Sequence, residues 1–184
     1  DKVSLKVSKG DYIAIMGPSG SGKSTLLNII GGLDRISGGE VLLDGKRIDN
    51  LDENSLVEIR RRKIAYVFQQ YHLLPSLTAV ENVYMPLLFG GSNGNGLDKA
   101  MEFLKMVGLE KRAKHKPGQL SGGEQQRVAI ARAIVHDPSL ILADEPTGNM
   151  DQRTGADILE VFAHLNEAGR SIVMVTHSPE VARH

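Results

Sequence analysis

The chain has 184 residues, with 22 Lys and Arg balanced by 22 Asp and Glu, so its formal net charge is zero. This balance gives no support to nucleic-acid binding, which normally shows as a strongly basic domain. The absence of cysteine excludes disulfides, thiolate metal sites and cysteine nucleophiles. No apolar run approaches the ~18 residues of a membrane span, and the length suits a single domain with a sizeable core.

The N-terminal part contains two candidate hairpins. Residues 3–7 alternate apolar and polar side chains, and we expect them to pair with the short apolar run at 12–16. Residues 39–48 predict a second hairpin, because apolar segments flank an Asp44-Gly45 turn signal. The run at 12–16 is also typical of a parallel strand that is buried on both faces.

The apolar run at 12–16 leads directly into a glycine-rich loop, Gly17-Pro18-Ser19-Gly20-Ser21-Gly22-Lys23-Ser24, followed by Thr25. The loop matches the pattern G-x-x-x-x-G-K-[ST] at every fixed position. Glycines let successive backbone N–H groups curl around an anion, and a helix beginning near Gly22 directs its positive end at that anion. We predict that this stretch binds nucleotide phosphates, with Lys23 on the outer phosphates and the Ser24 hydroxyl on Mg²⁺.

A helix is predicted at 53–60, and it ends in a basic run at 60–63. Such a run could contact lipid headgroups or nucleic acid. We interpret it instead as a solvated helix end, whose cations suit the negative end of the helix dipole.

The rest of the chain alternates strands with helices. Further helices are predicted at 78–89, 97–107, 124–135 and 151–168, and further strands at 64–68, 139–143 and 171–175. The glycine-rich stretch at 90–96 is typical of a flexible connector. This order predicts an α/β fold of the P-loop NTPase type: a mostly parallel sheet with flanking helices, an N-terminal antiparallel part and a small helical lobe. The site is expected at the carboxyl ends of the strands.

Two carboxylates, Asp144 and Glu145, directly follow the predicted strand at 139–143. In this arrangement one carboxylate can anchor Mg²⁺ while the other faces an attacking water. We assign Asp144 to the metal, through water, and Glu145 to the role of general base. The alternative is that the two carboxylates are simply a polar strand end. The predicted phosphate loop at Gly17 makes this alternative far less favoured.

A second glycine motif completes a recognisable set. Leu120-Ser121-Gly122-Gly123-Glu124, followed by Gln125-Gln126-Arg127, matches the signature motif of the nucleotide-binding domains of ATP-binding-cassette (ABC) transporters. Gln69 matches the Q-loop glutamine of that family, Asp151 its D-loop and His177 its switch histidine, in the same order. The chain therefore resembles this family over nearly its whole length. The detailed sequence of its motifs is similar to that of the family branch that contains lipoprotein-releasing, macrolide-export and cell-division ATPases.

The resemblance implies how the residues divide the work with ATP and Mg²⁺. Gln69 would sense Mg²⁺ and link the site to a membrane partner, and His177 would contact the γ-phosphate. Ser121, Gly122 and Gly123 would act on nucleotide held by a second copy, and Asp151 of the D-loop would be a further nucleotide-binding residue. A second glycine loop that opens a second helix is a second anion site, so we expect a head-to-tail homodimer.

We therefore expect an ATPase on the inner, cytoplasmic face of the cell membrane that powers a separate integral-membrane permease subunit. The single domain 1–184 would divide into a nucleotide-binding core, residues 1–70 and 136–184, and a helical signature lobe, residues 71–135. One alternative is an ATPase that regulates a cell-division machine without transport. Another is a minimised, catalytically weak domain.

The second alternative, a minimised domain, rests on three features of the family that this chain lacks. Its members stack adenine on an aromatic residue ahead of the first glycine loop, carry a longer charged stretch near 90–96, and continue with one more strand. We expect the present chain to be a trimmed domain, with Tyr12 as the first candidate to replace the adenine platform.

Overall fold

The computed structural model describes residues 3–89, 95–179 and 181–183. A central sheet of four parallel strands has the order β1-β6-β5-β4. These strands are β1 (Tyr12–Met16), β4 (Ile64–Val67), β5 (Leu140–Asp144) and β6 (Ser171–Thr176). A separate antiparallel pair, β2 (Leu42–Leu43) and β3 (Lys46–Arg47), flanks the Asp44-Gly45 turn, as predicted.

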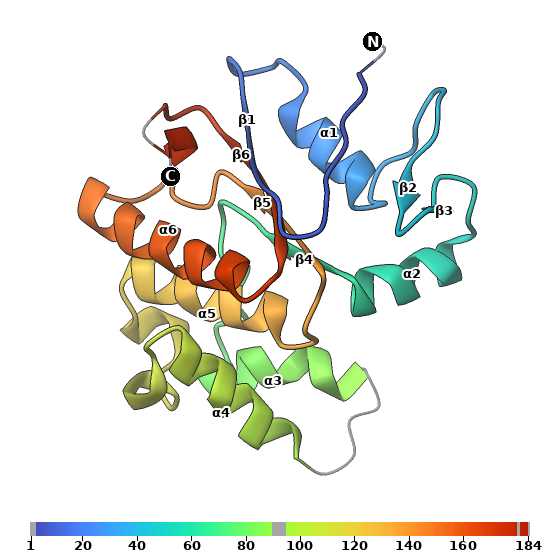
Figure 1. Cartoon of the computed structure of the whole chain (residues 1–184). Helices are drawn as coiled ribbons and strands as arrows, with labels where there is room; N and C mark the ends of the chain where they lie inside the picture. The colour runs from blue at the N-terminus through green and yellow to red at the C-terminus, as the bar shows by residue number, and fades with distance from the viewer. Residues whose placement is uncertain (1–2, 90–94, 180, 184) are drawn as a thin grey trace.

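The helices lie on both sides of this sheet. Those in α conformation are α1 (Lys23–Ile30), α2 (Glu53–Arg62), α3 (Ala79–Phe89), α4 (Gly96–Met106), α5 (Gly122–Ile134) and α6 (Gln152–Glu167). Three short 3₁₀ helices are η1 (Glu110–Arg112), η2 (Pro117–Gln119) and η3 (Val181–Arg183). Figure 1 shows α1 on one side of the sheet, α5 and α6 on the other, and α3 and α4 beyond α5. The predicted α/β class is confirmed.

The buried strands are apolar on both faces because both faces are covered. In β5, Leu140 and Leu142 pack into a cluster with Leu27 of α1. The alternate residues Ile141 and Ala143 pack into the larger cluster that contains side chains of α3, α4, α5 and α6. This period of two explains why continuous apolar runs marked the parallel strands in the sequence.

The expected hairpin between residues 3–7 and β1 is wrong. Residues 3–7 form no strand, and β1 pairs in parallel with β6. The turn between them is held against the start of β6, because Gly10 N–H donates to Ser171 Oγ and this hydroxyl donates to Ser8 O. Val3 and Leu5 are exposed. Alternation of side chains suits an extended backbone, but it does not choose the partner strand.

Tyr12 is not an adenine platform. It lies at the amino end of β1, whereas the glycine loop follows the carboxyl end, and its ring packs against the larger core cluster. Burial raises the pKa of the Tyr12 hydroxyl to about 12. The ring therefore serves the core at the end of the sheet opposite the site.

The connector predicted at 90–96 falls mostly outside the described residues. Of its seven positions, 90–94 are not described, and Gly96 is already the first residue of α4.

In the described ranges no helix combines the length and the apolar character needed to cross a membrane.

The basic run at 60–63 is paired with carboxylates. It lies in the last turn of α2 and just beyond it. Arg61 and Arg62 both contact Glu58, at 2.8 and 3.1 Å, Arg60 pairs with Glu53, and Lys63 pairs with Asp44. These pairs support the interpretation of a solvated helix end.

A fully buried amide, Asn82 of α3, organises the segment that leads from β4 to the helical lobe. Its Nδ2 donates to the carbonyls of Leu74, Leu77 and Thr78 at 3.0–3.2 Å, and its Oδ1 accepts from Leu74 N–H at 2.8 Å. Buried backbone groups need such partners because water cannot reach them. Asn82 therefore holds the loop in one conformation.

We predict that Asn82→Ala lowers the free energy of unfolding by roughly 2–3 kcal/mol, since several buried groups lose their partners. Urea denaturation measures this change. Asn54→Ala, the same substitution at an exposed position of α2, should stay within about 0.5 kcal/mol of the parent. Equal stability of the two variants would contradict the role of Asn82.

Candidate nucleotide site

The loop after β1 has the concave backbone that its glycines predicted. Gly20 and Gly22 have φ values of 78° and 90°, in the region that favours glycine. A Cβ on Gly17 would lie 2.8 Å from Ser21 Oγ, so the loop closes tightly on itself. Gly22 caps α1 without a side-chain hydrogen bond, so no cap side chain occupies the first N–H groups of the helix. These groups are suited to bind an anion.

Lys23 lies folded into this loop. Its Nζ donates to the carbonyls of Gly17 and Pro18 at 2.8 and 3.0 Å. The ammonium is thus satisfied by the same loop that would hold an anion. A bound phosphate would compete with these two carbonyls for the ammonium, since a charged acceptor forms the stronger hydrogen bond.

Ser24 and Asp144 bring two oxygen ligands together from opposite ends of the chain. Ser24 Oγ donates to Asp144 Oδ1 at 3.1 Å. Both oxygens are of the kind that Mg²⁺ prefers, and their short separation suits an ion that Ser24 would bind directly and Asp144 through water. No group of three or more His, Cys, Asp and Glu side chains able to hold a metal occurs among the described residues. The ion would therefore also depend on phosphate and water oxygens, as Mg²⁺ usually does.

Glu145 turns from the end of β5 toward β6. Its φ is 47°, uncommon for a residue with a Cβ, and its N–H donates to Val175 O at 2.9 Å. Its Oε2 lies 2.5 Å from His177 Nδ1, with the glutamate side chain 20% exposed and the histidine 63% exposed. The structure thus joins the predicted base and the predicted switch histidine directly.

Gln69 follows β4 and meets the segment after Glu145. Its Nε2 donates to Asn149 Oδ1 at 3.1 Å, and Asn149 Nδ2 donates to Gln69 O at 3.4 Å. A Cβ on Gly148 would lie 2.9 Å from Gln69 Nε2 and 3.2 Å from Glu145 Oε2. The glycine therefore lets Gln69 and Glu145 approach each other. Asn149 was not among the residues predicted for the site, because no local pattern in the sequence marks it.

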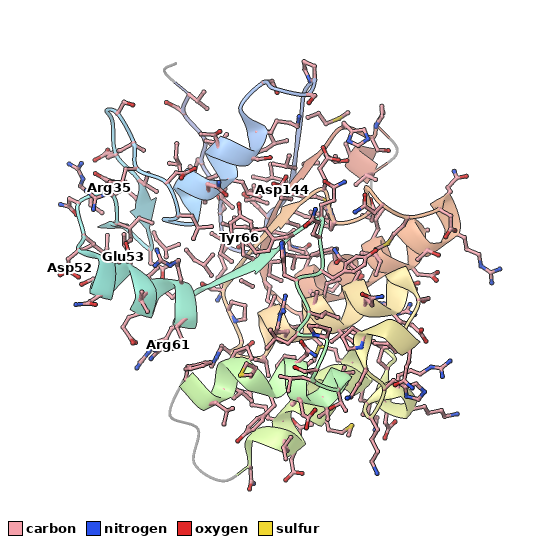
Figure 2. The ribbon with its side chains drawn as sticks, turned by 180° about the vertical axis from the view of Figure 1, so that it is seen from behind. Arg35, Asp52, Glu53, Arg61, Tyr66 and Asp144 are labelled. Atoms are coloured by element: carbon pink, nitrogen blue, oxygen red, sulfur yellow. The ribbon has the colours of Figure 1, made fainter. Side chains whose placement is uncertain are left out.

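A hydrogen-bonded tyrosine lies beside Asp144, and no local sequence pattern marks it. Tyr66 of β4 donates its hydroxyl to Asn28 Oδ1 of α1 at 2.5 Å. Burial raises the Tyr66 pKa, and the negative charges of Asp144 and Asp34 raise it further. Figure 2 shows Tyr66 and Asp144 close together on the neighbouring strands β4 and β5. The hydrogen bond between Tyr66 and Asn28 connects α1, the helix after the glycine loop, to strand β4.

Ser121 caps the second glycine helix, α5. Its Oγ accepts from Glu124 N–H at 3.2 Å, and Glu124 Oε2 accepts from Ser121 N–H at 2.8 Å. This capping box lowers the pKa of Glu124, and Arg112, which donates to Glu124 Oε1 at 3.0 Å, lowers it further. A side-chain hydrogen bond from Ser121 to the same carboxylate also lowers the Glu124 pKa, so both the N–H and the hydroxyl of Ser121 take part in the cap.

Gly122 and Gly123 are glycines for reasons of packing. A Cβ on Gly122 would lie 3.0 Å from the Tyr71 hydroxyl, and one on Gly123 would lie 2.3 Å from Thr154 Cγ2. Figure 1 shows the start of α5 well apart from the loop between β1 and α1. The structure therefore does not bring the signature residues to the chain's own phosphate loop.

Asp151 caps α6 instead of facing the phosphate loop. Its carboxylate accepts from Thr154 N–H at 3.0 Å and from Thr154 Oγ1 at 2.6 Å, and these bonds lower its pKa. It lines a cleft of about 680 Å³ together with Glu145 and His177. Asp151 and the pair of Glu145 and His177 thus line the same cleft.

A phosphate loop between a parallel strand and a helix, with an acidic residue at the end of another strand, defines a P-loop nucleotide-binding protein. The sequence model described as ABC transporter matches residues 1–148. An ABC transporter ATP-binding protein of Thermotoga maritima is 53% identical over 180 residues, which cover 97% of this chain and 77% of the relative. The chain belongs to the ABC transporter ATP-binding family.

Two further similarities bear on architecture. The macrolide export ATP-binding/permease protein MacB of Syntrophobacter fumaroxidans is 51% identical over 185 residues, which cover 98% of this chain and 26% of the relative. A dimeric structure of the ATP-binding cassette MJ0796 of Methanocaldococcus jannaschii, in a post-hydrolysis state bound to ADP and Pi, matches with a TM-score of 0.87. That match has 51% identity and covers 97% of this chain and 80% of the other.

We predict that Gly148→Ala slows phosphate release from Mg-ATP by about 100-fold, because the methyl group would displace Gln69 and Glu145 by a fraction of an ångström or more. ATP affinity, measured by calorimetry, should stay within a few-fold of the parent. Gly155→Ala is the matched control, since its Cβ would make ordinary contacts at 3.6 and 3.8 Å. Full hydrolysis by Gly148→Ala would show that this close approach is not needed.

Proposed function

We propose that this protein hydrolyses ATP to ADP and phosphate, and that ATP-driven head-to-tail pairing of two copies powers a separate integral-membrane permease subunit. The observation that carries the proposal is the pair formed by Glu145 Oε2 and His177 Nδ1 at 2.5 Å, at the same edge of the sheet as Ser24 and Asp144. Family membership and the ADP- and Pi-bound dimer of a relative support it.

In this proposal the loop from Gly17 to Thr25 holds the phosphates through its backbone N–H groups and the start of α1. The Lys23 ammonium leaves the carbonyls of Gly17 and Pro18 for the outer phosphates. Mg²⁺ would be held by Ser24, by Asp144 through water and by Gln69, and would neutralise charge on the phosphates.

Glu145 acts as the general base. It takes a proton from the attacking water as the new bond to the γ-phosphorus forms and the bond to the β-phosphate oxygen breaks, which releases ADP and phosphate. His177 orients the Glu145 carboxylate and contacts the γ-phosphate. Gln69, bonded to Asn149, lies near the same carboxylate because Gly148 has no Cβ to separate them.

The signature residues would complete the site of a second copy. The N–H groups at Gly122 and Gly123 suit the γ-phosphate of ATP bound by that copy, and the Ser121 hydroxyl would turn from Glu124 to the phosphate. Asp151 and its loop would lie against the partner at the same junction. Because α5 begins far from the chain's own phosphate loop, pairing of two copies gives these groups a phosphate to bind.

The permease is proposed as the partner on the cytoplasmic face of the membrane. One relative is named as an ATP-binding and permease protein in a single chain, of which the present chain covers only 26%. We also propose the division into a nucleotide-binding core, 1–70 and 136–184, and a helical lobe, 71–135. Gln69 lies at the boundary of the two parts and would report the state of the site to the permease.

Phosphate release from Mg-ATP is the direct test of the enzymatic part. Glu145→Gln should slow the release by ~10²–10⁴-fold, because an amide can hold the water but cannot take its proton. The parent protein and Glu145→Asp, which retains a carboxylate, are the comparisons. Unchanged hydrolysis by Glu145→Gln would show that Glu145 is not the base.

Pairing is tested in the same background. Glu145→Gln should form a persistent ATP-dependent dimer, since uncleaved ATP bridges the copies, and adding Ser121→Arg should abolish it by filling the second anion site. Size-exclusion chromatography with light scattering, with and without ATP, reads the mass. The shared-site assignment is wrong if the double variant still dimerises, or if its monomer no longer binds ATP.

A further inference from the structure

A second glutamine after the signature loop reaches both sides of the catalytic site. Gln126 of α5 is fully buried, and its Nε2 donates to Pro146 O at 2.9 Å and to Phe68 O at 3.3 Å. Pro146 directly follows Glu145, and Phe68 directly precedes Gln69. One amide group therefore holds the backbone next to the proposed base and next to the proposed Mg²⁺ sensor.

The oxygen of the same amide supports the view that Gln126 is present for its two donated hydrogen bonds. Gln126 Oε1 is buried and has no hydrogen-bond partner within the part of the chain that the structure describes. A buried acceptor without a partner costs stability, so packing alone would favour an apolar side chain at this position. What the glutamine adds is the pair of bonds to Phe68 and Pro146.

An arginine further along the same helix holds the segment after Gln69. Arg132 donates through Nη2 to Tyr71 O at 2.8 Å and through Nη1 to His72 O at 2.5 Å. His72 has a φ of 47°, an uncommon conformation for a residue with a side chain, which needs support from its surroundings. The planar guanidinium grips two successive carbonyls as a fork, which an ammonium cannot do.

These contacts make α5 a rigid connection. The helix runs unbroken from Gly122 to Ile134, so the residues of the signature loop and the donors Gln126 and Arg132 move together. Gln126 spans the proposed boundary between lobe and core, because it bonds to Phe68 and Pro146 of the core. Arg132 fixes Tyr71 and His72, where the lobe begins.

We propose that Gln126 and Arg132 are positioning residues that couple the signature loop of α5 to the placement of Gln69 and Glu145. Neither side chain touches the phosphate loop; each acts through the backbone that carries the catalytic groups. This inference rests on the proposed ATPase function. It adds that engagement of the signature loop by a second copy is transmitted, through α5, to the base of the same chain.

Two measurements test the inference. Gln126→Met keeps the length of the side chain and removes both bonds, so hydrogen exchange of peptides covering 68–73 and 144–148 should become faster in the nucleotide-free protein. The rate of phosphate release should fall about ten-fold while ATP affinity stays within two-fold. Gln125→Met is the matched control, because Gln125 donates to Leu120 O at 3.1 Å and not to the catalytic segments.

A double-mutant cycle separates positioning from a general loss of stability. Because Gln126 acts partly through the segment of Gln69 and partly through Pro146, Gln69→Ala with Gln126→Met should lose less activity than the product of the two single losses. Multiplied effects of the two substitutions, or unchanged exchange in both segments, would overturn the inference. If Gln126→Met does not fold, Arg132→Lys replaces it in the same cycle. Because Arg132 bonds to Tyr71 and His72 in the segment after Gln69, the double variant with Gln69→Ala should release phosphate no more slowly than the slower single variant. A parent protein that releases no phosphate would refute the proposed function, while the exchange rates would still decide whether α5 holds the two segments.

Discussion

The parallel pairing of β1, β6, β5 and β4 is the constraint on which the rest of the structure depends. Parallel strands in one sheet end at the same edge, so groups from four distant segments meet there. The glycine loop follows β1, Gln69 follows β4, Glu145 follows β5 and His177 follows β6. Burial of both sheet faces fixes the register of these strands, and therefore the spacing of the groups at their ends.

Close approach at this edge requires unusual backbone as well as suitable side chains. Glu145 adopts a positive φ, and Gly148 has no Cβ to separate Gln69 from the carboxylate. Such conformations persist only where surrounding contacts hold them. Here the contacts are the bond from Glu145 N–H to Val175 O and the reciprocal bonds between Gln69 and Asn149.

Helix α5 links this edge of the sheet to the signature loop at Ser121, Gly122 and Gly123. Its first turn carries the capping box of Ser121 and Glu124, and its middle carries Gln126, which bonds to the backbone beside Gln69 and Glu145. The same helix belongs to the core cluster that spans the sheet and the helical lobe. A force on the signature loop would therefore be carried into the site by bonded contacts through a packed helix rather than through a flexible loop.

The sequence by itself determined the phosphate loop, the acidic pair, the signature motif and the order of strands and helices, because these are local patterns of a few residues. Only the tertiary structure decided that residues 3–7 form no hairpin and that Tyr12 is a core residue, since both depend on which elements lie alongside. It also decided the hydrogen bonds of Asn149 to Gln69 and of Gln126 to Phe68, which join residues 80 and 58 positions apart in the chain. Hydrogen bonds across such separations leave no local periodicity, so they become visible only when the chain is folded.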